Sequence, residues 1–98
     1  MAIAVEVSAH GPGATMDNYF ELLKRMGTSP EGRHPDASCL FHWIREEPNG
    51  YVVTDVWTDR ASLDKFVEEK VTPLSQELGM PQPHLKFLDV ANYLTAGG

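Results

Sequence analysis

The sequence predicts one α+β domain whose elements run strand, helix, strand, strand, helix, strand. Three observations predict this order. β-branched runs alternate with two stretches whose apolar residues recur at helical spacing, a Pro-Asn-Gly turn joins the two central strands, and no linker separates two cores. The chain has 98 residues, of which 42% are hydrophobic and 22% charged, and this is enough for one small core. We therefore treat residues 1–98 as a single domain.

The first third of the chain predicts a strand, a capped helix and a long loop. Residues 2–8 (AIAVEVS) favour a strand because β-branched side chains fit a pleated sheet. Thr15 is a candidate helix N-cap, and Gly27 stands where a helix ends in the left-handed conformation. Between them the apolar residues repeat at helical spacing, at Met16, Tyr19, Leu22, Leu23 and Met26. Residues 27–38 form a polar, Pro/Gly-rich loop that is either a surface connection or a lid over a site.

The remainder predicts a hairpin, a second helix and a last strand. Residues 39–46 and 51–58 form the hairpin. The second helix begins near Asp59, and Thr72-Pro73 predicts a break or kink because proline lacks an N–H donor. Residues 85–94 form the last strand. The order βαββαβ is the ferredoxin-like arrangement, a four-stranded antiparallel sheet with both helices on one face.

The turn between the two central strands decides which side chains share a face of the sheet, because side chains alternate along a strand. A three-residue turn at residues 48–50 suits the Pro-Asn-Gly sequence and would set Trp43 opposite Asp55. A two-residue turn would invert the faces and set His42 opposite Trp57. The three-residue turn is the favoured prediction.

Both faces of the predicted sheet are apolar in either register. An open antiparallel sheet in a monomer usually has one wet face, and two helices cover only one face of this sheet. The other face would leave a patch of exposed apolar side chains of the kind that marks an interface. We therefore expect a symmetric homodimer in which this face packs against its copy.

The composition excludes several classes of protein. The formal net charge is −6, and no cluster of lysine and arginine offers a surface for nucleic acid or an anionic membrane. No apolar run reaches the roughly 18 residues of a membrane span. Cys39 is the only cysteine, so we expect a cytoplasmic domain without an intramolecular disulfide. The four histidines show no metal-ligand spacing, and we expect no metal site.

Two residues of the hairpin are candidates for acid–base chemistry. Asp55 lies mid-strand among apolar residues, which suits a general base, and its alternative is an ion pair with Arg45. His42 lies between two aromatic residues and could carry a proton near neutral pH, and its alternative is a hydrogen-bonded core histidine. Four further side chains are candidates for contacting a planar ligand or donating a hydrogen bond to it: Trp57, Trp43, Tyr19 and Asn92.

Residues 53–63 (VTDVWTDRASL) carry a family resemblance, in an acidic-x-Trp strand end followed by a polar turn and an Ala-containing helix start. In this segment and in element order the chain resembles the dimeric α+β barrel superfamily, particularly its antibiotic-biosynthesis-monooxygenase-like branch. Several members of that branch oxidise polycyclic phenols or quinols with O₂ and no bound metal or flavin. The resemblance implies a cavity between sheet and helices, lined by Trp57.

The chain also departs from this family. Many relatives place a histidine one turn into the second helix, where this chain has Phe66. The related haem-degrading branch has an asparagine on the first strand, and residues 3–8 contain none. Two hypotheses about function follow. The protein is a cofactor-independent monooxygenase acting on a planar hydrophobic phenol or quinol, or it is a non-catalytic module that binds a small molecule or assembles with itself.

Overall fold

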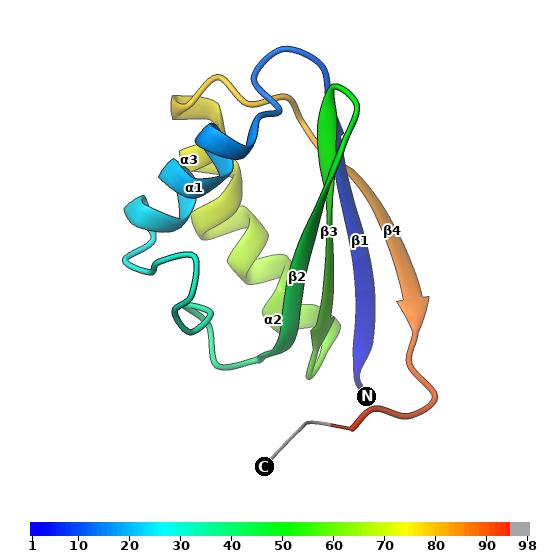
Figure 1. The fold of residues 1–98 in the computed structure, drawn as a ribbon. Helices are drawn as coiled ribbons and strands as arrows, with labels where there is room; N and C mark the ends of the chain where they lie inside the picture. Colours follow the sequence, from blue (N-terminus) through cyan, green and yellow to red (C-terminus); the bar gives the residue numbers. More distant parts are fainter. Residues whose placement is uncertain (95–98) are drawn as a thin grey trace.

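The helices and strands follow the predicted order in a computed structural model, which describes residues 1–94 (Figure 1). The elements, in chain order, are β1 (Ile3–His10), α1 (Met16–Arg25), β2 (Cys39–Glu47), β3 (Gly50–Trp57), α2 (Arg60–Phe66), the π-helical turn η1 (Val67–Val71), α3 (Thr72–Glu77) and β4 (His84–Asp89).

The four strands form one antiparallel sheet in the order β2-β3-β1-β4. All the helices lie on one face of this sheet, and no element of the described chain covers the other face (Figure 1). This arrangement confirms the predicted ferredoxin-like α+β fold. No helix within residues 1–94 combines the length and the apolar character needed to cross a membrane.

Both helix starts form as the sequence predicts. The Thr15 side chain accepts a hydrogen bond from the backbone N–H of Asn18, and the Asp59 carboxylate does the same for Ser62. Gly27, at a φ of 84°, follows the end of α1 in the left-handed conformation. These caps set where α1 and α2 begin, and they direct one face of each helix toward the sheet.

The predicted break at Thr72-Pro73 is wrong. Thr72 is itself helical, with φ −61° and ψ −50°, and its N–H bonds to the carbonyl of Val67, five residues back. Pro73 cannot donate a backbone hydrogen bond, and the π-helical turn η1 comes directly before α3, so the helix is irregular at the predicted place but is not broken there. The stretch from α2 to α3 therefore runs as one continuous helical rod along the cavity.

The favoured hairpin register is also wrong. Glu47 pairs with Gly50, so the turn has two residues, with Pro48 first and Asn49 second at a φ of 62°. Proline followed by a left-handed asparagine suits a type II turn, which needs no third residue. His42 consequently pairs with Asp55 on the face that the helices cover, because a change of one residue moves every side chain of a strand to the other face.

The rest of the pairing also differs from the two-residue alternative. That alternative set His42 opposite Trp57, whereas the two-residue turn pairs Glu47 with Gly50 and thereby sets His42 opposite Asp55. A bulge between Cys39 and Phe41, farther along the strand, brings Cys39 opposite Trp57. The last strand ends at Asp89 and not at residue 94. Asn92 therefore lies beyond β4 in an exposed segment.

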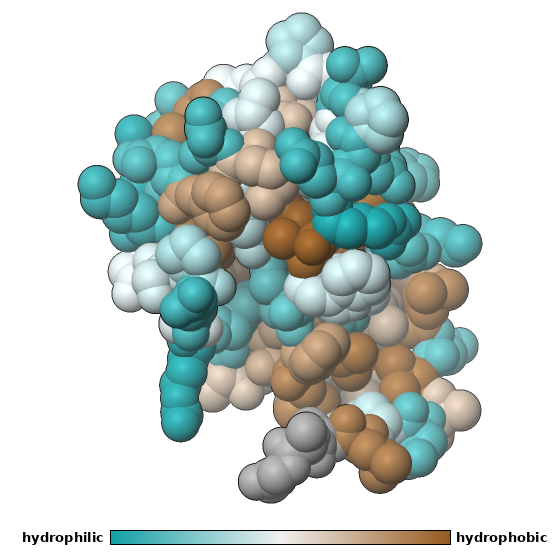
Figure 2. All heavy atoms as spheres, viewed as in Figure 1, coloured by the Kyte–Doolittle hydropathy of each residue, from teal (hydrophilic) through white to brown (hydrophobic). Residues whose placement is uncertain are grey.

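The two faces of the sheet differ in burial. The helix-covered face holds the core, with Val5 and Trp57 fully buried. The open face carries large apolar side chains that stay exposed in one copy of the chain, with Phe41 at 62%, Trp43 at 44% and Leu88 at 41% exposure. Figure 2 shows apolar side chains gathered toward the lower end of the sheet in this view.

Candidate functional site

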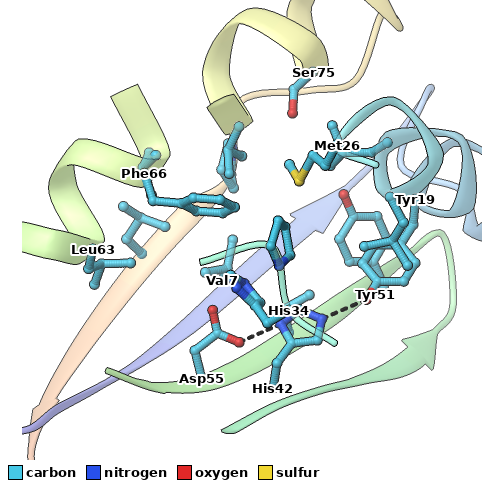
Figure 3. Close-up of a pocket in the computed structure, with 18 of the residues that line it drawn as sticks. Val7, Tyr19, Met26, His34, His42, Tyr51, Asp55, Leu63, Phe66 and Ser75 are labelled. Carbon is cyan, nitrogen blue, oxygen red and sulfur yellow. Dashed lines mark hydrogen bonds and ion pairs between the residues drawn. The ribbon is translucent and has the colours of Figure 1, made fainter. Parts of the chain in front are cut away.

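A cavity of about 90 Å³ lies between the helix-covered face of the sheet and the helices. Most of its wall is apolar, with aliphatic and aromatic side chains from α1, α2, η1 and all strands but β2. Four of its polar side chains converge: Tyr19 of α1, His34 of the long loop, His42 of β2 and Asp55 of β3 (Figure 3). The hydroxyls of Tyr51 and Ser75 also line the cavity. An apolar pocket with a few convergent polar groups is the usual form of a small-molecule site.

Four side chains form a continuous series of hydrogen bonds in the cavity wall. The Tyr19 hydroxyl lies 2.6 Å from His42 Nε2, and His42 Nδ1 lies 2.6 Å from Asp55 Oδ1 (Figure 3). The indole Nε1–H of Trp57 donates to Asp55 Oδ2 at 3.1 Å. Asp55 is only 6% exposed, so this carboxylate is held inside the protein by two hydrogen-bond donors.

The series fixes the proton positions on the neutral His42 ring. A carboxylate accepts hydrogen bonds and donates none, so Nδ1 carries the proton that Asp55 accepts. Nε2 then has a free lone pair, and the Tyr19 hydroxyl donates to it. The arrangement matches a histidine base oriented by an aspartate, with the basic nitrogen turned toward Tyr19 and the cavity.

Tyr19 is a hydrogen-bond donor in this series and not a base. Burial is the main cause that raises its pKa to about 12, and the Asp55 and Tyr51 side chains contribute to the same rise. The hydroxyl therefore keeps its proton throughout the physiological pH range. Its ring is buried against Tyr51 and stands parallel to the His42 ring, which fixes its position.

His34 is a site residue that the sequence analysis missed. Its ring centroid lies 5.0 Å from that of Phe66, 5.3 Å from that of Trp57 and 5.5 Å from that of His42. Burial lowers its pKa, an effect opposed by Asp55, so the ring favours its neutral form. The available signal was the length of the 27–38 loop, but nothing local indicates that this histidine turns inward.

Cys39 lies beside the same polar groups. Donor atoms of His34, Cys39 and Asp55 lie within 4.8 Å of one another, a set of ligand types that zinc and similar ions use. Sequence spacing gave no sign of this cluster, because the loop and two strands bring the three together. Burial and Asp55 raise the pKa of the Cys39 thiol to about 12, and its S–H donates to the Phe41 carbonyl. In this state Cys39 is a thiol, and both oxygens of Asp55 already accept hydrogen bonds.

The structure brings together four of the six predicted site residues. Tyr19, His42, Asp55 and Trp57 all line the cavity. Trp43 is on the open face, because the two-residue turn inverts the favoured register. Asn92 lies beyond β4 and outside the cavity wall, because the last strand is shorter than predicted.

The alternative partner of Asp55 is wrong as well. Arg45 lies on the same strand as His42 but three residues along, so its side chain projects from the opposite face of the sheet. Its guanidinium pairs with Glu47 at 3.4 Å. The roles of all the candidate residues in binding or catalysis remain predictions.

Several solved structures resemble this chain over most of their length. Rv0793 from Mycobacterium tuberculosis has a TM-score of 0.66 at 12% identity and covers 97% of this chain and 100% of its own. A variant of SnoaB, a cofactor-independent oxygenase from Streptomyces nogalater, has a TM-score of 0.56 at 16% identity, with 95% and 94% covered. An antibiotic biosynthesis monooxygenase has a TM-score of 0.59 at 20% identity, with 94% and 100% covered.

A comparison with family models finds no match for the chain, and neither does a comparison with curated proteins. At these sequence identities, likeness in structure is a statement about the fold and not about the reaction. The four-stranded sheet, the helices on one face and the extent of the match agree with one another. The protein therefore shares its fold with solved structures described as antibiotic biosynthesis monooxygenases and with a cofactor-independent oxygenase.

Proposed function

We propose that the cavity binds a small planar phenol or quinol and that His42 removes a proton from it, so that the resulting anion reacts with O₂. The Tyr19–His42–Asp55 series of hydrogen bonds carries this proposal, because it places an oriented base in an otherwise apolar cavity. The fold likeness to a cofactor-independent oxygenase supports the same chemistry.

The proton transfer follows from the geometry. A substrate hydroxyl that takes over the hydrogen bond of Tyr19 delivers its proton to His42 Nε2, and the substrate oxygen becomes an anion. Asp55, bonded at 2.6 Å to Nδ1–H, stabilises the imidazolium that forms. Tyr19, which keeps its proton, then donates to the substrate anion and stabilises its charge.

The anion supplies the electrons for the reaction with O₂. For a phenol whose keto tautomer has a ring methylene carbon, as in anthrone, the carbanion form adds O₂, and the resulting peroxide takes up a proton. Loss of water then leaves a ketone, and the overall change is CH₂ + O₂ → C=O + H₂O. A hydroquinone has no such carbon, so its anion passes two electrons to O₂ and loses its second proton, and the products are a quinone and H₂O₂. The chain's own residues need only deprotonate the ring and exclude bulk water from the anion.

The size of the cavity limits what it holds. At about 90 Å³ it is smaller than a cavity of roughly 150 Å³ that accommodates one benzene ring. A ring therefore enters only if the wall moves. His34 and Pro35 of the 27–38 loop form part of this wall, and single-ring quinols need a smaller displacement than three-ring compounds.

One observation favours a second candidate, a binding module without catalysis. The lone pair of His42 that would act as the base is already occupied by the Tyr19 hydroxyl at 2.6 Å. A ligand that leaves this hydrogen bond in place would be bound by the apolar wall without losing a proton.

Oxygen uptake separates the two candidates. Purified protein is incubated in air with anthrone and, separately, with methyl-substituted hydroquinone, and O₂ consumption is followed with an electrode. We expect the wild type to consume O₂ above the background rate and His42→Gln to lose this activity. His84→Gln should keep it, because His84 is exposed on β4. Equal rates in the two variants would exclude His42 as the base, and binding without uptake would favour the non-catalytic module.

The open face of the sheet supports a proposal about assembly. Phe41, Trp43 and Leu88 are exposed there in one copy of the chain. We propose that two copies pack these faces together, which removes the apolar patch from water. At about 25 cal/mol per Å², a patch of several hundred Å² on each copy contributes several kcal/mol before the cost of association.

A further inference from the structure

His34 is placed where a surface loop seldom sends a polar side chain. It comes from the polar 27–38 loop, yet its ring packs against the rings of Trp57, Phe66 and His42. Figure 3 shows His34 beside His42 in the cavity wall. The His34 ring packs on Phe66, the last residue of α2. The loop thus brings a second imidazole into the cavity wall.

The loop backbone sets the protonation of this imidazole. The N–H of Asp36 donates to His34 Nδ1 at 3.0 Å, and the Asp36 carbonyl lies slightly farther from the same nitrogen, at 3.2 Å. The shorter contact makes Nδ1 the acceptor, so the proton of the neutral ring is on Nε2. Burial lowers the pKa of His34, which keeps the ring in this neutral form.

Nε2 of His34 is free to bind something else. Within residues 1–94, no protein group lies at hydrogen-bond distance from it, and no buried side-chain nitrogen or oxygen lacks a partner. This nitrogen is therefore accessible and not sealed in the core. His42 and His34 consequently form a complementary pair in one cavity wall, since Nε2 of His42 accepts a hydrogen bond and Nε2 of His34 donates one.

We propose that His34 is a second catalytic residue, whose Nε2–H donates to the second oxygen of a substrate that carries two oxygen atoms on a planar ring. This inference rests on the proposed function. When His42 takes the proton of the first hydroxyl, negative charge spreads through the ring to the second oxygen, and a neutral N–H donor stabilises it there. The substrate class narrows to hydroquinones and hydroxyaryl ketones or aldehydes.

The charge of the site supports this role. The carboxylate of Asp55 is in the same cavity wall, so an anion forming beside it is repelled unless donors compensate. Tyr19 supplies one donor at the first oxygen. A ring held only at that end would leave the delocalised charge against a largely apolar wall. The Tyr51 and Ser75 hydroxyls also line this wall, but the His34 ring lies beside the proposed base, with its centroid 5.5 Å from that of His42.

A phenol with a visible ionisation tests the inference. 4-Hydroxybenzaldehyde has one ring, one acidic hydroxyl and a second oxygen, and its absorption spectrum distinguishes phenol from phenolate. The probe is titrated with pH in the presence of excess protein, and the apparent pKa of the bound phenol is compared with that of the free phenol. The variants are His34→Phe, which keeps an aromatic ring against Phe66, His34→Gln, which keeps an N–H donor, and His84→Phe, an exposed control.

We expect the wild type and His84→Phe to lower the apparent pKa of the bound phenol. His34→Phe should raise it again by about one unit, a tenfold loss of affinity for the phenolate, as expected for one hydrogen bond to an anion. His34→Gln should restore most of the shift. If His34→Phe matches the wild type while His42→Gln abolishes the shift, the role of His34 is refuted and the proposed base stands. If His34→Gln is as impaired as His34→Phe, an N–H donor at this position does not restore the shift, and the proposed hydrogen-bond role fails. If the wild type neither binds nor shifts the probe, the proposed function fails too.

Discussion

The substitution Asp55→Asn tests the hydrogen-bond series with a change of one atom. Asp55 accepts from His42 Nδ1–H and from the Trp57 indole N–H. An asparagine has one accepting oxygen and one donating NH₂ group. Trp57 can only donate, so the amide oxygen faces the indole and the NH₂ group faces His42. His42 must then release the proton on Nδ1 and carry it on Nε2, so its free lone pair no longer faces Tyr19.

The magnitude follows from these two bonds. A hydrogen bond to a charged group contributes about 1.5–3 kcal/mol to the free energy of unfolding, and a neutral one contributes about 0.5–1.5 kcal/mol. Because both bonds change from charged to neutral in the variant, the free energy of unfolding falls by about 2 kcal/mol. The variant also removes a buried charge that was costly to desolvate, which keeps the loss near this value. For a domain of this size, 2 kcal/mol lowers Tm by roughly 10 °C. Proton abstraction from a quinol should fall by about 10³–10⁴-fold, the effect known for a triad carboxylate replaced by its amide.

Urea unfolding, thermal unfolding and ¹⁵N NMR of the histidine side chains measure the two effects. Asp64→Asn is the matched control, because Asp64 pairs with Arg60 at 2.9 Å on the exposed surface of α2 and should cost less than about 0.5 kcal/mol. A His42 ring that keeps its proton on Nδ1 in Asp55→Asn, together with unchanged stability, would refute the hydrogen-bond directions on which the site is built.

Three further predictions test other parts of the structure. The pKa of Tyr19 is raised from 10.0 to about 12, so the folded state holds a proton that the unfolded chain loses. The resulting stabilisation is complete below pH 10 and is lost as pH rises toward 12. Tyr19→Phe should therefore flatten the dependence of the urea midpoint on pH in that interval. Trp43→Arg should convert the proposed dimer to a particle of 10.9 kDa in light scattering, whereas a wild type that is itself monomeric at all concentrations would contradict the dimer. Gly13→Ala would bring a Cβ atom to 2.2 Å from the Gly79 carbonyl oxygen and should lower the free energy of unfolding, measured in urea, by about 2–3 kcal/mol. Gly11→Ala is the control and should cost less, because Gly11 also has a left-handed φ but its added Cβ would meet no atom within 4 Å.

Features that depend on near neighbours in the sequence were predicted well. Thr15 and Asp59 cap their helices because each bonds to a backbone N–H three residues ahead, which is a local contact. The alternation of apolar residues predicted strands and an apolar second face. Trp57 and Asp55 were identified as cavity residues from the acidic-x-Trp strand end, and Tyr19 from its place on the inward stripe of α1.

The errors concern features that local pattern leaves open. Trp43 was placed in the site because both turn lengths are compatible with Pro-Asn-Gly, and the left-handed φ of Asn49 selects the shorter one. Asn92 was placed in the last strand because residues 85–94 are apolar enough to continue it, but β4 ends where its pairing with Ile3 ends. His34 was missed because its neighbours in the sequence are loop residues and its contacts are 8 to 32 positions away.

The sequence by itself determined the order of the elements, the boundaries set by caps and glycines, and the presence of large apolar side chains on both sheet faces, because these depend on residue type and spacing within a few positions. The open face also carries charged side chains, among them Glu6, Arg45 and Lys86. Only the tertiary structure decided which side chains meet in the cavity. A strand pattern with period two is equally regular in either register, so the pairing of His42 with Asp55 depends on the length of the turn. The side chains of a loop follow no repeating pattern, so the position of His34 depends on its contacts with residues that are distant in the sequence.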